Sequence, residues 1–429
     1  MGDKMETLRL DSSGPIVDLL QSTLKKLGFY TGLIDGIFGK NTENSVKLFQ
    51  KNFDLLPDGI VGGKTWDALS PYINGRALYT IKQGDSLFSI ANQFHTTVPR
   101  ILFANPSILP NQLRIGSKII VPFGNIVPTN VRYTSSLLEM NLLDMQILYP
   151  FLELGTIGTS RLGKEIKYVK LGTGPKEVFY SGSFHANEWI TTPVLMKFIE
   201  QYLFAYVHNT TLLGYNARDL FRSVSLYIVP MVNPDGVDLV TGEIKTGSFA
   251  YNQAQAISKS FPSIPFPSGW KANLQGIDLN LQFPAEWQEA RRIKFAQGFT
   301  APAPRDFVGD GPLVAPEALA IYNFTLAHRF SLILAYHTQG KEIYWQFQNY
   351  APQRAESIGQ QFSKISGYLL TQVPYNSSFA GYKDWFLQEY RKPGYTIEAG
   401  LGQNPLPISS FNEIYQDNLG ILVLGMILS

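Results

Sequence analysis

The sequence contains no cysteine and only five histidines among its 429 residues. The absence of cysteine excludes disulfides, thiolate zinc sites and cysteine nucleophiles, so any metal must be held by histidine and carboxylate side chains. The formal net charge is +2, and no stretch concentrates lysine and arginine, which gives no reason to expect a nucleic-acid partner. No apolar run approaches the roughly 20 residues that a membrane-spanning helix needs, so we expect no membrane span.

The two ends of the chain carry little targeting information. The N-terminal stretch MGDKMETLRL lacks the apolar core of a secretion signal, so we expect no signal peptide in this chain. The apolar C-terminal run GILVLGMILS is short and is expected to form a core helix or strand. A chain of this length exceeds one ordinary hydrophobic core, and two or three domains are therefore expected.

An internal repeat occurs in the first part of the chain, where DGIFGKNT at residues 35–42 returns as DGIVGGKT at residues 58–65. Each Asp-Gly pair favours a turn, and the threonine that ends each copy is predicted to cap the helix that follows. Apolar residues at helical spacing predict one helix between the copies and another upstream, closed by Gly28. This compact unit, residues 1–74, resembles the three-helix type of peptidoglycan-binding domain.

The next segment, residues 77–124, is predicted to combine two short strands with two helices. The strands are expected at Tyr79–Ile81 and Lys118–Val121, and the helices at Leu87–Phe94 and Val98–Phe103. The turn Gly84-Asp85-Ser86 can cap the first helix. The segment resembles a lysin motif domain, and that family binds glycans that contain N-acetylglucosamine. Both N-terminal segments therefore imply peptidoglycan as a partner.

From residue 130 to the C-terminus, strand-like and helix-like segments alternate. The runs KEVFYSGSF, VSLYIVPMV, SLILAYH and YTIEAG are apolar, β-branched and aromatic, which is typical of buried strands. The alternation predicts a large α/β domain over residues 130–429, with a mixed, mostly parallel sheet flanked by helices on both faces. In such sheets, ligands bind beyond the carboxyl ends of the strands.

Two histidines and a glutamate stand at the ends of these predicted strands. His185 and Glu188 follow the first strand, and His337 ends another. Two imidazoles and one carboxylate form a common ligand set for catalytic zinc, with the fourth position left for water. A His-x-x-Glu pair alone is weak evidence, because such short patterns arise by chance.

Further segments give the pair its context. VNPDGVD, GIDLNLQFP, YHTQG, AGYKDWF and YTIEAG occur in the order and approximate spacing of the zinc carboxypeptidases, and the chain from Val131 onward resembles this carboxypeptidase A-like superfamily. The resemblance implies one zinc ion per chain, held by His185, Glu188 and His337. It also implies that Glu398 is the general base, which accepts a proton from a zinc-activated water and returns it to the leaving amine.

Two positions that bind substrate in the family differ in this sequence. Lys271, after Trp270, takes the place of an arginine that stabilises the oxyanion, although a lysine lacks the planar fork. The alternative is a solvated surface lysine. Asn280 is retained where the family binds the terminal carboxylate of the substrate, but Leu281 replaces the arginine beside it and cannot make that contact. An enzyme that tolerates chain on both sides of the cut is therefore favoured.

Three more residues are candidates for binding substrate. Lys383 falls where the family sets the preference for the residue after the cleaved bond. A cation there would suit a side chain that bears a carboxylate, such as that of diaminopimelate, whereas the alternative is that Lys383 points to solvent. Tyr375 and Tyr382 are two candidates for the mobile tyrosine of the family.

These features together predict a zinc metallopeptidase that hydrolyses the γ-D-glutamyl–meso-diaminopimelate (or Lys) bond of peptidoglycan stem peptides. The glycan strands would bind residues 1–124, and the stem peptides would bind at the zinc site. We expect the protein to be associated with the cell wall or the spore, or to be cytoplasmic. The alternatives are a conventional metallocarboxypeptidase acting on free C-termini, a catalytically decayed wall-binding protein, and a deacylase acting on a non-peptide acyl group.

Overall fold

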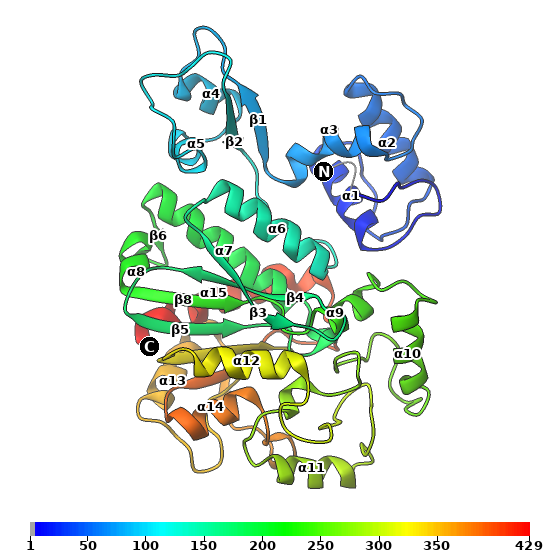
Figure 1. Ribbon diagram of the computed structural model, residues 1–429, viewed down its shortest axis with the longest axis vertical. Helices are drawn as coiled ribbons and strands as arrows, with labels where there is room; N and C mark the ends of the chain where they lie inside the picture. The colour runs from blue at the N-terminus through cyan, green and yellow to red at the C-terminus, as the bar shows by residue number, and fades with distance from the viewer. Residues whose placement is uncertain (1–4) are drawn as a thin grey trace. The chain divides into compact units, whose positions relative to one another are not determined.

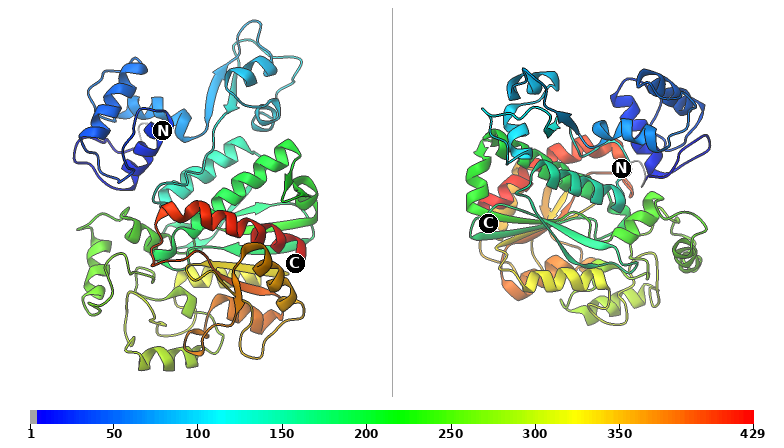
Figure 2. Two further views of the ribbon diagram at one scale, coloured as in Figure 1. Left: turned by 180° about the vertical axis from the view of Figure 1, so that it is seen from behind. Right: turned by 45° about the horizontal axis from the view of Figure 1, so that its top comes forward.

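The computed structural model describes residues 5–429 and is shown in three orientations in Figure 1 and Figure 2. The chain divides into two compact units. The first contains the chain up to Arg132 with Ser136–Leu152 and Leu203–His208, and the second contains Tyr133–Ser135, Glu153–Tyr202 and Asn209–Ser429. Most of helix α6 (Ser135–Leu148) therefore belongs to the first unit, although the sequence assigned it to the third predicted domain.

The repeated segments form two copies of one hydrogen-bonded turn. Helices α1, α2 and α3 span Pro15–Lys26, Lys40–Asn52 and Gly63–Ile73. The side-chain amide of Gln21 donates to Asp35 and Thr42, and that of Gln50 donates in the same way to Asp58 and Thr65. The predicted threonine caps were wrong, because the N-cap positions are glycines without side-chain caps and each threonine lies inside its helix, where it accepts a hydrogen bond from glutamine.

The lysin-motif segment has the predicted strand, helix, helix, strand order. Its elements are β1 (Arg76–Thr80), α4 (Leu87–Gln93), α5 (Val98–Ala104) and β2 (Lys118–Pro122). The two strands pair antiparallel, and an apolar cluster that includes Ile90, Ile101 and Val121 fills the space between strands and helices. Ser86 caps α4 as predicted, because its hydroxyl accepts a hydrogen bond from the backbone of Ser89.

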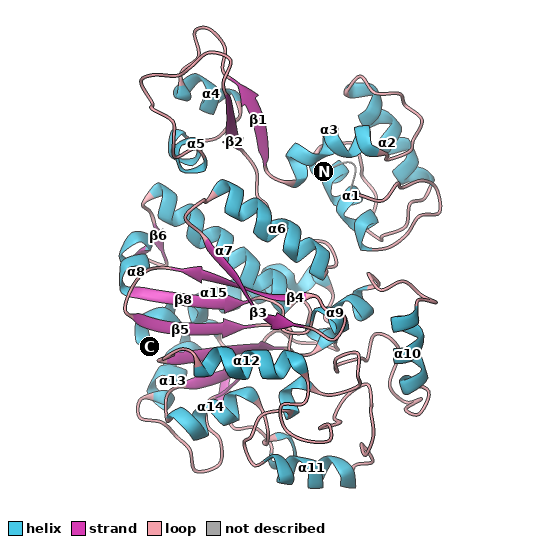
Figure 3. Ribbon diagram, viewed as in Figure 1, coloured by secondary structure: helices cyan, strands magenta, loops and turns pink. Residues whose placement is uncertain are grey.

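The second unit is built on an eight-stranded sheet of order β11-β10-β12-β9-β5-β8-β4-β3, drawn in magenta in Figure 3. The strands are β3 (Glu153–Thr159), β4 (Glu165–Leu171), β5 (Lys176–Ser181), β8 (Val224–Val229), β9 (Leu332–His337), β10 (Glu342–Tyr344), β11 (Leu369–Thr371) and β12 (Gly394–Glu398). Four of the neighbouring pairs are parallel, including the central β12-β9-β5-β8 run, and the others are antiparallel. The prediction of a mixed, mostly parallel sheet is confirmed.

Helices cover both faces of this sheet. Those of the second unit are α7 (Thr191–His208, which ends in the first unit), α8 (Ala217–Ser223), α9 (Pro234–Thr241), α10 (Phe249–Ser258), α11 (Trp287–Ala296), α12 (Pro316–Leu326), α13 (Ala355–Ser366), α14 (Tyr382–Tyr390) and α15 (Phe411–Leu428). Neighbouring residues of β5 show the two faces. Phe179 packs against rings of α12 and α14, whereas the Tyr180 hydroxyl donates to the carbonyl of Leu422 in α15 on the other side.

The two segments whose conformation the sequence left open are helical. The C-terminal apolar run is the core helix α15, and part of the insertion at residues 241–267 forms α10, which lies in an apolar cluster with Trp270. A short pair of strands, β6 (Thr211–Leu212) and β7 (Tyr215–Asn216), completes the second unit. In the described part of the chain, none of the helices combines the length and the apolar character needed to cross a membrane.

Candidate metal centre and active site

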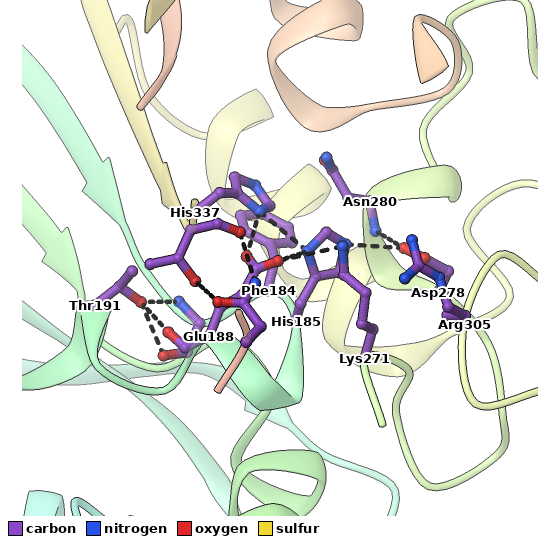
Figure 4. A network of polar contacts seen from close by, with 12 residues as sticks. Phe184, His185, Glu188, Thr191, Lys271, Asp278, Asn280, Arg305 and His337 are labelled. Carbon is purple, nitrogen blue, oxygen red and sulfur yellow. Dashed lines mark hydrogen bonds and ion pairs between the residues drawn. The ribbon is translucent and has the colours of Figure 1, made fainter. Parts of the chain in front are cut away.

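The sheet brings three predicted ligands together at the carboxyl ends of its parallel strands. His185 follows β5, a turn of 3-10 helix (Ala186–Glu188) carries Glu188, and His337 is the last residue of β9. The Nδ1 atoms of His185 and His337 lie 3.1 Å apart, and each lies 2.9 Å from a different oxygen of Glu188. All three side chains are buried, and Figure 4 shows them pointing toward one another.

The donor set fits a zinc ion. Ligands at the usual zinc distances of about 2.0–2.2 Å in a tetrahedron stand roughly 3.3–3.6 Å from one another, a few tenths of an ångström more than the observed 2.9–3.1 Å. Two imidazole nitrogens and a carboxylate face one another in a buried space. A cation bound there would provide a partner for all three groups. Since the chain has no cysteine, this nitrogen and oxygen set matches the ligands that the sequence allows.

Asp278 contacts the side of the His185 ring that faces away from the other ligands. Its Oδ1 lies 3.1 Å from His185 Nε2, so the outer nitrogen of the ring faces a carboxylate while Nδ1 faces the other ligands. Such a partner fixes the tautomer of a metal-binding histidine and makes its inner nitrogen more basic. Burial would lower the pKa of His185, but the Glu188 and Asp278 carboxylates raise it to about 9. Asp278 belongs to the segment that the sequence matched to the family, although its own role was not predicted.

Glu398 ends β12 directly beside His337 in the strand register, and it lines the pocket next to the histidines. Burial raises the pKa of the Glu398 carboxyl, and the Glu188 carboxylate adds to this effect, so the pKa reaches about 8 in the metal-free site. A carboxyl group with a pKa near neutrality can both accept and release a proton at ordinary pH. A cation held by the three ligands would lower this pKa and leave the carboxylate able to accept a proton, as the predicted general base requires.

Lys271 lies at the same centre. Its Nζ is 3.2 Å from Glu188 Oε1, and only 18% of the side chain is exposed, so the alternative of a solvated surface lysine is wrong. Burial lowers the pKa of Lys271, but the Glu188, Asp278 and Glu398 carboxylates together raise it, so the side chain stays charged. The predicted cation therefore stands beside the cluster.

The pocket in front of the cluster has a volume of about 270 Å³ and includes two further predicted residues, Asn280 and Lys383. Asn280 Oδ1 accepts a hydrogen bond from the backbone of Tyr382, and Leu281 also lines the pocket. The alternative that Lys383 points to solvent is wrong, because the side chain is buried. Its Nζ donates to the carbonyl of Gln346 and lies 2.6 Å from Asp384 Oδ1.

The two tyrosine candidates occupy different environments. Tyr382 is fully buried, its ring stacks on Phe184, and its hydroxyl lies 3.0 Å from that of Thr325, so it packs in the core and does not face the pocket. Tyr375 is 58% exposed and its hydroxyl donates to Glu289. Its neighbour Pro374 lines the pocket, so Tyr375 stays the better candidate for a mobile residue.

Sequence reasoning missed several charged residues that the structure brings to this pocket. Arg305 and Asp306 come from the segment between α11 and α12, and Lys294 comes from α11. The Asp306 carboxylate forms ion pairs with Lys294 and Arg305, and its backbone N–H donates a hydrogen bond to Asp278. The segment APAPRDF has neither helical nor strand periodicity, so the only available signal was an Arg-Asp pair within a Pro/Ala-rich loop.

A buried His-Glu-His cluster with an acid and a cation beside it is typical of metal-dependent hydrolases that act on amide bonds. The zinc carboxypeptidase family model matches residues 138–420, and the chain belongs to this family. The peptidoglycan binding domain model matches residues 13–69, and the LysM domain model matches residues 79–122.

Named relatives agree with this membership, and a solved structure shares the fold. The chain is 43% identical over 296 residues to gamma-D-glutamyl-L-diamino acid endopeptidase 1 of Lysinibacillus sphaericus, an alignment that covers 69% of this chain and 72% of the relative. It is 39% identical to the uncharacterized protein YqgT of Bacillus subtilis, over 68% of this chain and 76% of the relative. Carboxypeptidase A of Helicoverpa armigera shares the fold with a TM-score of 0.52 and 17% identity, over 83% of this chain and 99% of that chain.

Proposed function

We propose that this metallopeptidase is an endopeptidase of peptidoglycan stem peptides, which cleaves the amide between the γ-carboxyl of D-glutamate and meso-diaminopimelate or lysine. The observation that carries the proposal is the pocket wall, where Asn280 is followed by Leu281 instead of a carboxylate-binding arginine. An isobutyl group cannot make a charge-assisted contact with a terminal carboxylate, so a substrate chain can continue beyond the cleaved bond. The name of the Lysinibacillus relative supports the same bond.

The N-terminal domains favour the same substrate. A peptidoglycan-binding domain and a LysM domain precede the peptidase domain, and both families are associated with the wall polymer. Holding the peptidase on glycan strands would raise the local concentration of stem peptides at the metal centre without any new contact in the active site. We therefore propose that the protein acts at the cell wall or the spore.

We assign a different role in hydrolysis to each group of residues in the site. His185, Glu188 and His337 would hold zinc, which when bound polarises the scissile carbonyl and lowers the pKa of the attacking water. Glu398 would accept a proton from that water and deliver it to the nitrogen of the leaving diamino acid. Lys271 would face the negative charge that develops on the carbonyl oxygen, because its ammonium group already lies beside Glu188.

Replacing Lys271 with alanine should lower kcat by about 10²- to 10³-fold, because a single oxyanion donor is worth roughly that factor. Lys271→Arg is the matched control, since it keeps the charge at this position and should recover most of the rate. Zinc content, measured by elemental analysis, should be the same in both variants. Equal rates for the alanine variant and the wild type would show that the lysine has no role in the reaction.

The proposed bond specificity can be tested with defined stem peptides. Mass spectrometry of the products from tri-, tetra- and pentapeptide stems should show L-Ala-γ-D-Glu together with the released diamino acid fragment, and a chelator should abolish these products. Cleavage of an ordinary dipeptide with a free C-terminus, without cleavage of the stems, would identify a conventional carboxypeptidase instead. No cleavage of any substrate by the zinc-loaded protein would leave only a wall-binding role.

A further inference from the structure

Arg305 differs from the other cations of the pocket in its exposure and in its unused hydrogen-bond donors. Lys271, Lys294 and Lys383 are each paired with a carboxylate, and their side chains are only 18%, 10% and 3% exposed. The Arg305 side chain is 45% exposed, and its one ion pair joins Nε to Asp306 Oδ2 at 2.6 Å. Among the residues that the structure describes, its two terminal nitrogens have no hydrogen-bond partner.

Neighbouring residues hold this guanidinium in place. Asp306 binds Arg305 through one oxygen and Lys294 through the other, at 2.6 Å each. The backbone N–H of Asp306 donates to Asp278, the same carboxylate that orients His185. Arg305 is therefore anchored through its inner nitrogen and presents its outer edge to the pocket. Figure 4 shows it next to Asp278, on the side of His185 that faces away from His337.

Backbone hydrogen bonds also fasten the loop that carries Arg305 to the segment that carries Lys271. Pro304, which precedes Arg305, accepts hydrogen bonds from the backbone N–H groups of both Lys271 and Ala272. Lys271 is the cation proposed to face the scissile carbonyl oxygen, and the loop that carries Arg305 is fastened to its segment, which favours the acyl half of the substrate as the partner of Arg305. Lys383, the candidate for the leaving half, comes instead from α14.

A γ-linked D-glutamate carries a chemical group that an ordinary peptide lacks at this position. Its α-carboxylate stays free when the γ-carboxyl forms the amide, so a negative charge lies a few bonds from the scissile carbonyl on the acyl side. We propose that Arg305 is the specificity-determining residue that binds this α-carboxylate through its two terminal nitrogens. A guanidinium matches a carboxylate with two parallel hydrogen bonds, which gives orientation as well as attraction. This inference rests on the proposed function.

The test compares two stem tripeptides that differ only in this group, one with D-glutamate and one with D-isoglutamine, whose α-carboxylate is an amide. The zinc-loaded wild type should cleave the glutamate substrate about 10- to 100-fold faster in kcat/KM, because a charged hydrogen-bonded pair is worth roughly that factor. Arg305→Gln should cleave both substrates with similar kcat/KM. Relative to the wild type, kcat/KM should fall only for the glutamate substrate. Arg305→Lys should keep part of the preference, since it retains charge but not the fork.

The matched control is Arg222→Gln, which alters an exposed arginine of α8 that is paired with Asp219, and it should keep the full preference. Equal cleavage of both tripeptides by the wild type, or an unchanged preference in Arg305→Gln, would overturn the inference while leaving the endopeptidase activity established. The inference would also be overturned if Arg305→Gln changed only the preference between diaminopimelate and lysine substrates. That result would mean that Arg305 contacts the leaving half of the substrate. Failure to cleave either tripeptide would instead reject the proposed function.

Discussion

Replacing Glu398 with glutamine should lower kcat/KM on a γ-D-glutamyl-diaminopimelate peptide by about 10³-fold, since a positioned acid-base group typically contributes roughly 10²- to 10⁴-fold. Glutamine has nearly the same shape as glutamate, so the pocket should keep its form, but its amide cannot accept the proton of the attacking water. The loss should appear in kcat with little change in KM, because the variant still binds substrate. Steady-state kinetics on a defined stem peptide, with zinc content verified, provides the measurement.

Glu342→Gln is the matched control for this variant. Glu342 pairs with Glu398 across the β10–β12 ladder. The control therefore makes the same change, from a carboxylate to an amide, at a neighbouring position. Its carboxylate accepts a hydrogen bond from Tyr344, and we expect less than about a tenfold change in rate, because it is not positioned to transfer a proton. Sedimentation with purified peptidoglycan should show unchanged binding for both variants. An unimpaired Glu398→Gln enzyme would refute the assignment of the general base.

The elements that position the site could be predicted because each depends on local sequence. The strands that end at Ser181, His337 and Glu398 are short apolar runs, and the residues after them are polar, which is the pattern of a buried strand that opens into a ligand site. Parallel pairing of β5, β9 and β12 then aligns their carboxyl ends. The convergence of His185, Glu188 and His337 follows from that alignment.

The environment of the other pocket residues could not be predicted, because it depends on contacts between distant parts of the chain. Lys383 was weighed between pocket and solvent, yet it is buried by Asp384 and by the carbonyl of Gln346, which lies 37 positions earlier. Arg305 lies in a loop without periodicity, and its position depends on backbone bonds from Lys271 and Ala272 to Pro304. Neither hydrophobic spacing nor propensity contains information on such contacts.

Removing zinc should abolish hydrolysis, and zinc affinity should depend strongly on pH because of a single histidine. In the metal-free site the pKa of His185 is about 9, since Glu188 and Asp278 outweigh the effect of burial. Burial lowers the pKa of His337, and the two histidines and Lys271 keep the pKa of Glu188 well below its usual value despite burial, so both are already deprotonated near neutrality. Among the three ligands, His185 is therefore the one that holds a proton which zinc must displace.

Zinc affinity should accordingly rise at least about tenfold for each pH unit between about pH 7 and pH 8 and level off above pH 9, because protons compete for His185 only below its pKa. Competition against a chromophoric chelator at several pH values gives the slope, and calorimetry in two buffers of different ionisation enthalpy should count at least one proton released per zinc, with any further proton coming from Glu398. His337→Ala should lose stable zinc binding and all hydrolysis. A zinc affinity that does not change with pH would mean that His185 is neutral in the empty site. Glu188 and Asp278 would then not keep its imidazole ring protonated.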